Sequence, residues 1–158
     1  SGGTALSLAK LDEAIDAVDM PTHLIMNRAM RRRLSAAARS TSVGGYITYE
    51  LDAFGRTVTK YADLPILIVD QDNTGAEIMQ FNEAAAAGGA TATSIYVVSF
   101  EEGKLTGIQN GTVMVEDLGE LQTKPSLRTR VEWYAGISLW HPRAACRLWS
   151  IADAAVTA

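Results

Sequence analysis

The longest regular pattern in the sequence is an alternation of apolar and polar residues over positions 127–140. Successive side chains of a β-strand point to opposite faces, so the pattern predicts one long strand with an apolar and a polar face. The apolar face would carry Leu127, Thr129, Val131, Trp133, Ala135, Ile137 and Leu139. Such a strand would reach about 45 Å, whereas a globule of this length has a radius of gyration of about 15 Å. The pattern therefore indicates an elongated building block.

Two helices are predicted near the N-terminus. Apolar residues at steps of three and four predict a helix over residues 4–19, with a stripe formed by Leu8, Leu11, Ile15 and Val18. Met20-Pro21 ends this helix, and residues 22–26 are predicted to form a short buried strand. Asn27 is then expected to be the N-cap of a second helix, residues 28–39.

The rest of the chain is predicted to be mostly β, in six further segments at residues 46–51, 56–61, 64–69, 94–100, 104–109 and 144–151. The first two would be joined by a turn at residues 53–55. Residues 94–100 and 104–109 are expected to pair as a hairpin. Residues 70–75 and 84–92 are expected to be surface connections. Helices and strands do not alternate in a βαβ order, so the predicted fold class is α+β: a mixed sheet flanked by two helices, with a long β-strand at the C-terminal end.

Composition excludes several classes of protein. The chain has 158 residues, 47% hydrophobic and 20% charged, with a net charge of -4, which argues against disorder and against a strongly basic nucleic-acid binder. Its single cysteine, Cys146, cannot form an internal disulfide. No apolar run approaches the ~20 residues that span a bilayer. Residues 1–3 have no initiator Met or signal-peptide features. We therefore expect these three residues to be a tag remnant or linker on a piece of something longer.

Four sequence segments occur in an informative order, and they carry a resemblance to a known family. They are residues 23–27 leading into 30–34, residues 54–56 followed by 64–67, residues 94–98 with 107–109, and residues 128–132 running into 141–145. Together with the long strand, they resemble the major capsid proteins of tailed bacteriophages. The fold of that family is named after phage Hong Kong 97 and is shared with encapsulin shells.

The resemblance implies a phage-capsid axial-domain architecture. It assigns residues 4–126 to the axial domain, and residues 127–158 to a long strand shared with the peripheral domain and a final returning strand. Members of the family also carry an N-terminal arm, an extended loop and a spine helix, for which this sequence has no candidate segment.

The function implied is structural and not enzymatic. Copies of a major capsid protein form hexamers and pentamers of an icosahedral phage head around DNA, in the virion, after assembly in the bacterial host cytoplasm. Scaffold and portal proteins are candidate partners, and packaged DNA is contacted only indirectly. No membrane, cofactor or small-molecule substrate is implied.

Two alternatives stay open. An encapsulin-like nanocompartment subunit has the same fold but encloses enzymes, so cargo would distinguish it. A nucleic-acid-binding module built on the arginine-rich helix would instead bind DNA in a salt-sensitive manner.

The predicted second helix has a cationic arc, formed by Arg28, Arg31, Arg32 and Arg39, beside an apolar arc formed by Met30, Leu34, Ala37 and Ala38. Guanidinium groups suit bidentate pairing with carboxylates at interfaces, which predicts that this arc contacts a neighbouring subunit. A solvated helix face with weak ion pairs is about as compatible with the sequence. Direct DNA binding is less compatible with the sequence, because an acidic chain with one basic arc makes few phosphate contacts.

Arg128, Arg130 and Glu132 share the polar face of the long strand. For each residue taken singly, solvent-facing charge is the simpler interpretation. As a set, they resemble the charged capsid strand that faces a neighbouring subunit. Some members of that family join subunits through a lysine and an asparagine. The expected neighbourhood of that asparagine holds Lys124-Pro125-Ser126 here, so no such bond is predicted.

Catalytic, cofactor-binding and metal sites are not predicted. His23 and His141 lack metal-ligand spacing, and Cys146 is expected to be a buried thiol. Residues 70–75 begin like a calcium loop, but Phe81 stands where the bidentate Glu belongs. We interpret the segment as an Asx-rich turn. The three tryptophans are interpreted as core or interface anchors: Trp133, Trp140 and Trp149.

Overall fold

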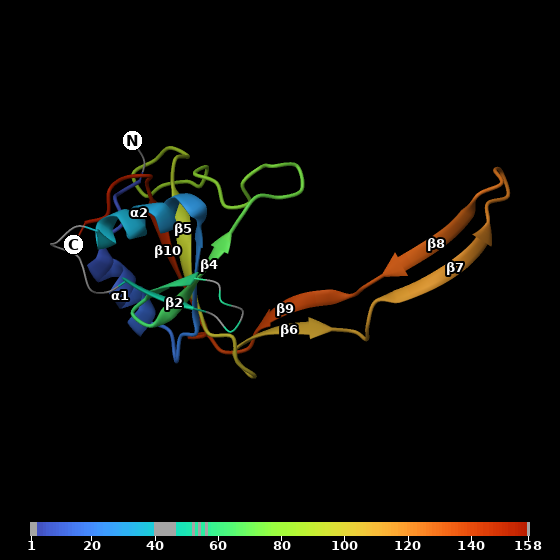
Figure 1. Ribbon diagram of the computed structural model, residues 1–158, viewed down its shortest axis with the longest axis horizontal. Coiled ribbons are helices and arrows are strands. Elements are labelled where there is room, and N and C mark those ends of the chain that lie inside the picture. Colours follow the sequence, from blue (N-terminus) through green and yellow to red (C-terminus); the bar gives the residue numbers. More distant parts are fainter. Residues whose placement is uncertain (1–2, 40–46, 52, 54, 56, 158) are drawn as a thin grey trace.

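The protein consists of a body, built on one mixed sheet, and a long arm that projects from it (Figure 1). The computed structural model describes residues 3–39, 47–51, 53, 55 and 57–157. Two helices, α1 (Leu8–Asp16) and α2 (Arg28–Ala38), lie on the body. The strands of its sheet are β1 (His23–Asn27), β2 (Ile47–Leu51), β3 (Thr57–Tyr61), β4 (Leu64–Val69), β5 (Thr93–Val98) and β10 (Ala145–Ile151).

The body sheet has the strand order β10-β5-β1-β4-β3-β2. Strand β1 is parallel to β4 and antiparallel to β5, which makes the sheet mixed. Helix α1 packs against β10, and α2 packs against β1 and β4. The core between them contains Leu11, Met30 and Leu34 from the helices and Leu24, Met26, Ile66, Ile95 and Val97 from the strands. The burial of each such side chain contributes about 1.5–3 kcal/mol, so this layer makes the body a rigid unit.

The predicted α+β class is confirmed, and the second helix forms almost where the sequence places it. Asn27 caps α2 by accepting a hydrogen bond from the backbone N–H of Met30 at 2.8 Å. Its side-chain amide donates to the carbonyl oxygen of Met79 at 3.2 Å and to the Thr93 hydroxyl at 3.3 Å. This buried residue therefore fixes the start of α2 and ties it to β5.

The first helix is shorter than the predicted range of residues 4–19. Thr4 and Ser7 form parallel β-bridges with Ile151 and Thr157, and the backbone N–H of Leu8 donates to the carbonyl oxygen of Thr157 at 3.0 Å. These hydrogen bonds hold the preceding residues in an extended conformation, so the helix begins at Leu8. Gly3 lies so close to Ala152 that an added Cβ would meet its backbone nitrogen at 2.9 Å. Residues 1–2 of the predicted tag remnant lie outside the described residues, as does part of the predicted turn at 53–55.

The predicted hairpin of residues 94–100 with 104–109 is wrong. Strand β5 lies inside the body sheet between β1 and β10, while β6 (Leu105–Gln109) leaves the body and pairs with β9 (Ala135–Leu139). The turn between them does form, since the backbone N–H of Lys104 donates to the Glu101 carbonyl at 3.1 Å. This turn directs the chain out of the body and into the arm, because both edges of β5 are occupied by β1 and β10.

The predicted single strand over residues 127–140 is interrupted. It forms β8 (Leu127–Glu132) and β9, separated at Trp133 and Tyr134. On the opposite side of the arm, β6 and β7 (Met114–Glu120) are separated by a bend that includes Gly111, whose φ is 76°. Strand β7 pairs with β8, and it was missed because its sequence has no clean alternation. The arm, residues 105–140, is thus two successive two-stranded ribbons (Figure 1).

Candidate assembly surfaces

The distal ribbon of the arm has one face richer in apolar residues and one face richer in charged residues. Paired residues of antiparallel strands share a face, and Val115 pairs with Val131 while Glu116 pairs with Arg130. The Arg130 guanidinium contacts the carboxylates of Glu116 at 3.2 Å and Glu132 at 2.8 Å. The two faces therefore follow the alternation seen in the sequence, although the strand itself is broken.

The apolar face continues along the proximal ribbon. Gly107 pairs with Ile137 and Gln109 pairs with Ala135. The Trp133 indole N–H donates to the side-chain oxygen of Gln109 at 3.3 Å, which holds the indole on the side of Gln109. The apolar residues of the proximal ribbon consequently extend to Trp133, at the interruption between the two ribbons.

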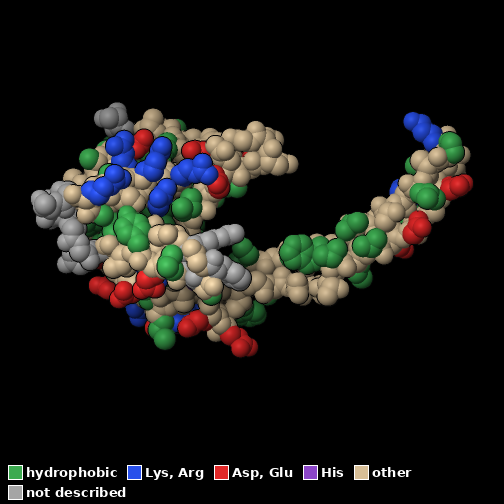
Figure 2. Space-filling model, viewed as in Figure 1, with side chains coloured by type: hydrophobic (Ala, Val, Ile, Leu, Met, Phe, Trp, Pro, Cys, Tyr) green, Lys and Arg blue, Asp and Glu red, His purple; other side chains and the backbone are tan. Residues whose placement is uncertain are grey.

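This apolar face is exposed. The exposed fraction is 79% for Ile137, 73% for Leu127 and 60% for Trp133. Most exposed large apolar side chains of the described chain lie on the arm, and Figure 2 shows hydrophobic side chains along it. Trp133, Trp140 and Trp149 are exposed, so their interpretation as core anchors is wrong. Their interpretation as interface anchors remains a prediction.

Two-stranded ribbons are marginally stable in water, and contiguous apolar patches mark interaction sites. The arm is therefore a candidate assembly surface.

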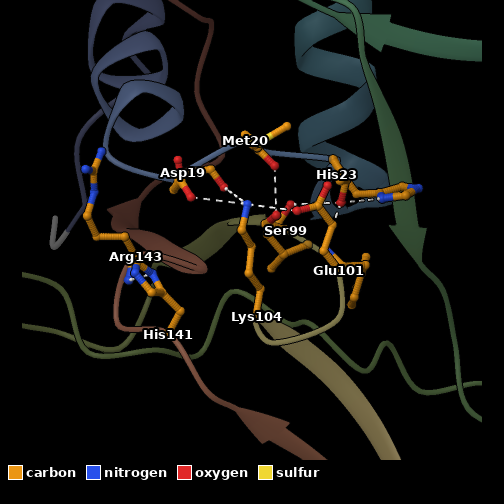
Figure 3. A network of polar contacts seen from close by, with 11 residues as sticks. Asp19, Met20, His23, Ser99, Glu101, Lys104, His141 and Arg143 are labelled. Atoms are coloured by element: carbon orange, nitrogen blue, oxygen red, sulfur yellow. Dashed lines mark hydrogen bonds and ion pairs between the residues drawn. The ribbon is translucent and has the colours of Figure 1, made fainter.

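A network of charged and polar groups attaches the arm to the body (Figure 3). The Lys104 ammonium contacts the carboxylates of Glu101 at 2.9 Å and Asp19 at 3.3 Å, and it donates to the Asp19 carbonyl at 2.9 Å. The backbone N–H of Asp19 donates to the Arg143 carbonyl at 2.9 Å. The Arg143 side chain donates to the Ala17 carbonyl at 3.3 Å. Both chain segments at the arm's root are thus tied to the end of α1.

The environment of Lys104 favours its charged form. Its side chain is only 12% exposed. The hydrogen bond to Glu101 raises the pKa of Lys104, with a further contribution from Asp19, while desolvation acts in the opposite direction. Ser99 adds a hydrogen bond from its hydroxyl to the Met20 carbonyl at 2.7 Å. Sequence reasoning missed this network, because its members come from segments far apart in the chain.

The arginines of α2 form a cationic area on the body (Figure 2). Arg28 is paired within the chain with Asp70, and Arg39 donates to the Ser35 carbonyl at 3.2 Å. The Nε of Arg31 is buried and has no hydrogen-bond partner in the described part of the chain. Arg32 is exposed.

Arg33 belongs to the same area, although it was absent from the predicted arc. Its Nε contacts the Asp153 carboxylate at 2.7 Å. The partner is distant in sequence, so no local signal pointed to the pair. Arg28 and Arg33 are thus held by carboxylates of the same chain, and Arg32 is the arginine of α2 best placed to meet another molecule.

Arg128, Arg130 and Glu132 lie on β8, in the distal ribbon, and the structure does not bring them near α2 (Figure 1). Arg130 and Glu132 form an ion pair on the charged face. Arg128 is exposed. The seven predicted interface residues therefore divide into two separate areas, one on the body and one on the arm.

The other residues considered in the sequence have local roles. Asp72 forms the expected Asx-type turn, accepting hydrogen bonds from the Thr74 hydroxyl at 2.6 Å and the Thr74 backbone N–H at 2.8 Å. These bonds, with those from Ala76 and Gly75, lower the pKa of Asp72. Cys146 is partly rather than fully buried. His23 packs edge-on against Phe100, with ring centroids 5.4 Å apart.

Within the described ranges, no three His, Cys, Asp or Glu side chains are grouped so that they could hold a metal ion. None of the helices formed by the described residues has the length and apolar character needed to cross a membrane.

Comparison with known proteins identifies the fold. No protein-family model matches the sequence, and no curated protein matches it. Among solved structures, the chain is similar to the holo-SrpI encapsulin complex from Synechococcus elongatus PCC 7942, with a TM-score of 0.70 and 13% sequence identity. The protein has a Hong Kong 97-like capsid fold.

The similarity covers 98% of this chain and 52% of the encapsulin chain. It therefore includes the arm as well as the body, and the chain spans about half the length of that structural neighbour. The predicted resemblance is confirmed at the level of this capsid fold. Because fold alone does not define function, the role of the protein depends on its surfaces.

Proposed function

We propose that the chain is part of a structural subunit of a closed protein shell, specifically a tailed-phage major capsid protein that encloses DNA. The observation that carries the proposal is the exposed apolar face of an arm that projects from a rigid body (Figures 1 and 2). A monomeric protein gains nothing by exposing such a surface. The capsid fold shared with an encapsulin neighbour supports the shell-subunit part of this proposal.

In this proposal, the body, with β10 as its returning strand, is the axial domain, and the arm links it to the peripheral domain. Copies associate into hexamers and pentamers, whose symmetry closes the shell. Area buried between copies supplies most of the association energy, and charged groups choose the register between neighbours. The protein would work in the virion after assembly in the host cytoplasm, with scaffold and portal proteins as partners and no enzymatic activity of its own.

The proposed interface also includes the arginines of α2 and the charged residues of β8. Arg32 gives the sharpest test, because reversing Arg28 would also break its internal pair with Asp70. We expect Arg32→Glu to impair particle formation, and Lys10→Glu, a charge reversal at an exposed site on α1, to leave it intact. Normal particles from Arg32→Glu would remove this face of α2 from the interface.

An encapsulin-like nanocompartment subunit is the second candidate, and the encapsulin neighbour favours it. The two candidates differ in cargo. Electron microscopy of the full-length gene product, followed by nuclease protection and protein analysis of purified particles, tests both. Closed particles with protected DNA support the phage capsid, and closed particles with enzyme cargo support the nanocompartment.

Absence of particles would refute both shell functions. The remaining alternative, nucleic-acid binding through α2, predicts salt-sensitive DNA binding by this chain alone. We expect little such binding, since Arg28 and Arg33 are already paired with carboxylates.

A further inference from the structure

We propose that the acidic end of α1 in one copy contacts the cationic arc of α2 in the next copy, so that the copies join head to tail. The acidic end of α1 is defined by Glu13 and Asp16. The cationic arc is formed by Arg28, Arg31, Arg32 and Arg39. This contact rests on the proposed shell function and names the partner of the α2 surface. Both surfaces belong to the body, and the arm takes no part in the contact.

The charges of both helices oppose the helix dipoles. The start of a helix carries partial positive charge and its end partial negative charge, so acids stabilise the start and bases stabilise the end. Helix α1 has no acid in its first turn and no base in its last turn, and three acids lie in its last five residues. Helix α2 has no acid in its first turn, and four arginines lie in its first six residues. A contact between these two ends relieves both conflicts, and such local conflicts are typical of functional surfaces.

The acids that end α1 are available to a partner. Glu13 and Asp16 are exposed, and residues three apart on a helix lie on the same face. Among the described residues, neither carboxylate has a hydrogen bond or an ion pair. Asp12, by contrast, accepts a hydrogen bond from the Tyr61 hydroxyl at 2.8 Å. The fold therefore leaves a pair of carboxylates without compensating charge.

The cationic arc has unused donors. Arg32 is exposed and has no partner in the part of the chain that the structure describes. The Nε of Arg31 is buried and, within the same described ranges, has no hydrogen-bond partner. Arg28 and Arg33, their neighbours on α2, are already paired with carboxylates of the same chain. A carboxylate can accept from several guanidinium donors, so carboxylates of a second copy would complete the series.

The two surfaces lie at different edges of the body. Figure 2 shows Lys and Arg side chains gathered over α2, and Asp and Glu side chains gathered at the opposite edge, where α1 ends in Figure 1. A self-complementary contact would set arginines against arginines. A contact between two different surfaces is heterologous, and its repetition by a rotation closes a ring.

The contact would choose the register between neighbours. Each exposed ion pair is weak by itself, but a ring repeats the same pairs at every junction. Complementary charges raise the rate of association and exclude wrong arrangements, and salt screens them. Assembly should therefore slow at high salt, while the body stays folded.

A charge exchange tests the contact in the full-length product. Arg32→Glu and Asp16→Arg each set like charges across the junction, so each should lower the yield of particles at least 10-fold in electron microscopy and sedimentation. Asp16→Arg places a base in the last turn of α1, which favours that helix. Neither variant should lower the melting temperature of the chain, so a loss of particles would not reflect unfolding.

Combining the two changes should restore assembly, because Glu at position 32 would then meet Arg at position 16 of the next copy. We expect Arg32→Glu/Asp16→Arg to yield at least fivefold more particles than either single variant. The matched control is Arg32→Glu/Glu102→Arg, which reverses an acid at another exposed site and should restore nothing. Single variants that assemble normally, or an exchange that restores no more than the control does, would overturn the contact.

Carbodiimide crosslinking of this chain separates the two proposals. Arg32→Lys keeps the charge and supplies an amine that the reagent joins to a carboxylate. In a mixture of ¹⁴N- and ¹⁵N-labelled chains, a peptide pair of mixed label can come only from two copies. We expect mixed pairs between position 32 and Glu13 or Asp16, at least 10-fold more abundant than those from Lys124 at the tip of the arm.

The outcomes are distinguishable. Mixed pairs from a protein whose full-length product never forms particles would keep the head-to-tail contact and refute the shell. Particles that ignore the charge exchange, together with a chain that gives no mixed pairs, would overturn the contact and leave the shell function standing.

Discussion

Truncating Ile137 to alanine should weaken association between copies without changing the stability of the isolated chain. Ile137 is 79% exposed on the apolar face of the arm, so its side chain is available to a partner and contributes little to the monomer. Surface truncations of this kind usually change the free energy of unfolding by less than about 0.5 kcal/mol. The effect should therefore appear only in association.

The magnitude follows from the area that assembly would cover. The substitution removes three carbon atoms, and each buried methylene contributes about 0.8 kcal/mol, which gives about 2.4 kcal/mol for complete burial. With 79% of the side chain exposed before association, the loss is about 1.9 kcal/mol per copy. This loss corresponds to roughly 25-fold in affinity for each contact that buries the side chain. Incomplete coverage would make this an upper value.

Ile108→Ala is the matched control, since Ile108 pairs with Gly136 and lies on the other face of the same ribbon. Sedimentation equilibrium of the chain, light scattering during particle assembly and thermal melting of both variants provide the measurements. The reasoning fails if Ile137→Ala assembles like the wild type, if Ile108→Ala weakens association equally, or if Ile137→Ala lowers the melting temperature by several degrees.

Three further changes test other parts of the structure. Lys104→Met should loosen the attachment of the arm, seen as a broader distance distribution in X-ray scattering, while Lys124→Met at the arm's tip should leave the distribution unchanged. Asn27→Ala removes a helix cap and two other hydrogen bonds, one of them fully buried, so it should lower the free energy of unfolding by about 2–4 kcal/mol in urea titrations. A loss below about 1 kcal/mol would contradict the capping role. The pKa of Asp72 is lowered in the folded chain, so its hydrogen bonds stabilise the loop fully above the ordinary pKa of 3.8. This stabilisation is lost as the pH falls through the pKa that Asp72 has in the folded chain. Near neutral pH, the Thr74 and Ala76 amides should therefore be better protected against hydrogen exchange in the wild type than in Asp72→Asn. In strong acid, the two proteins should show the same protection.

Local patterns in the sequence predicted the parts of the fold that depend on local physics. The cap at Asn27 follows from its side-chain chemistry, and the two faces of the arm follow from strand periodicity through Val131 and Ile137. The burial of Leu11 follows from helical periodicity. Such features need no knowledge of distant residues.

Features that depend on distant partners were not predictable in the same way. The sequence predicted a hairpin of β6 with β5, whereas β6 pairs with β9. The short loop between β5 and β6 favours a hairpin, and the sequence does not show that both edges of β5 are occupied by β1 and β10. The break after Glu132 coincides with the bend at Gly111 between β6 and β7, on the opposite side of the arm. The ion pairs of Arg33 with Asp153 and of Lys104 with Asp19 join segments that only the folded chain brings together.

The attachment of a long ribbon at one end gives the protein a mechanical property. Over a length of about 45 Å, a rotation of 5° at the Lys104 anchorage would displace the tip by about 4 Å, close to the ~4.8 Å spacing between neighbouring strands. A rotation too small to disturb the core could therefore shift a contact at the tip of the arm by nearly the spacing between two strands. Curvature of an assembly built from such units would be governed by a few ionic bonds beside α1.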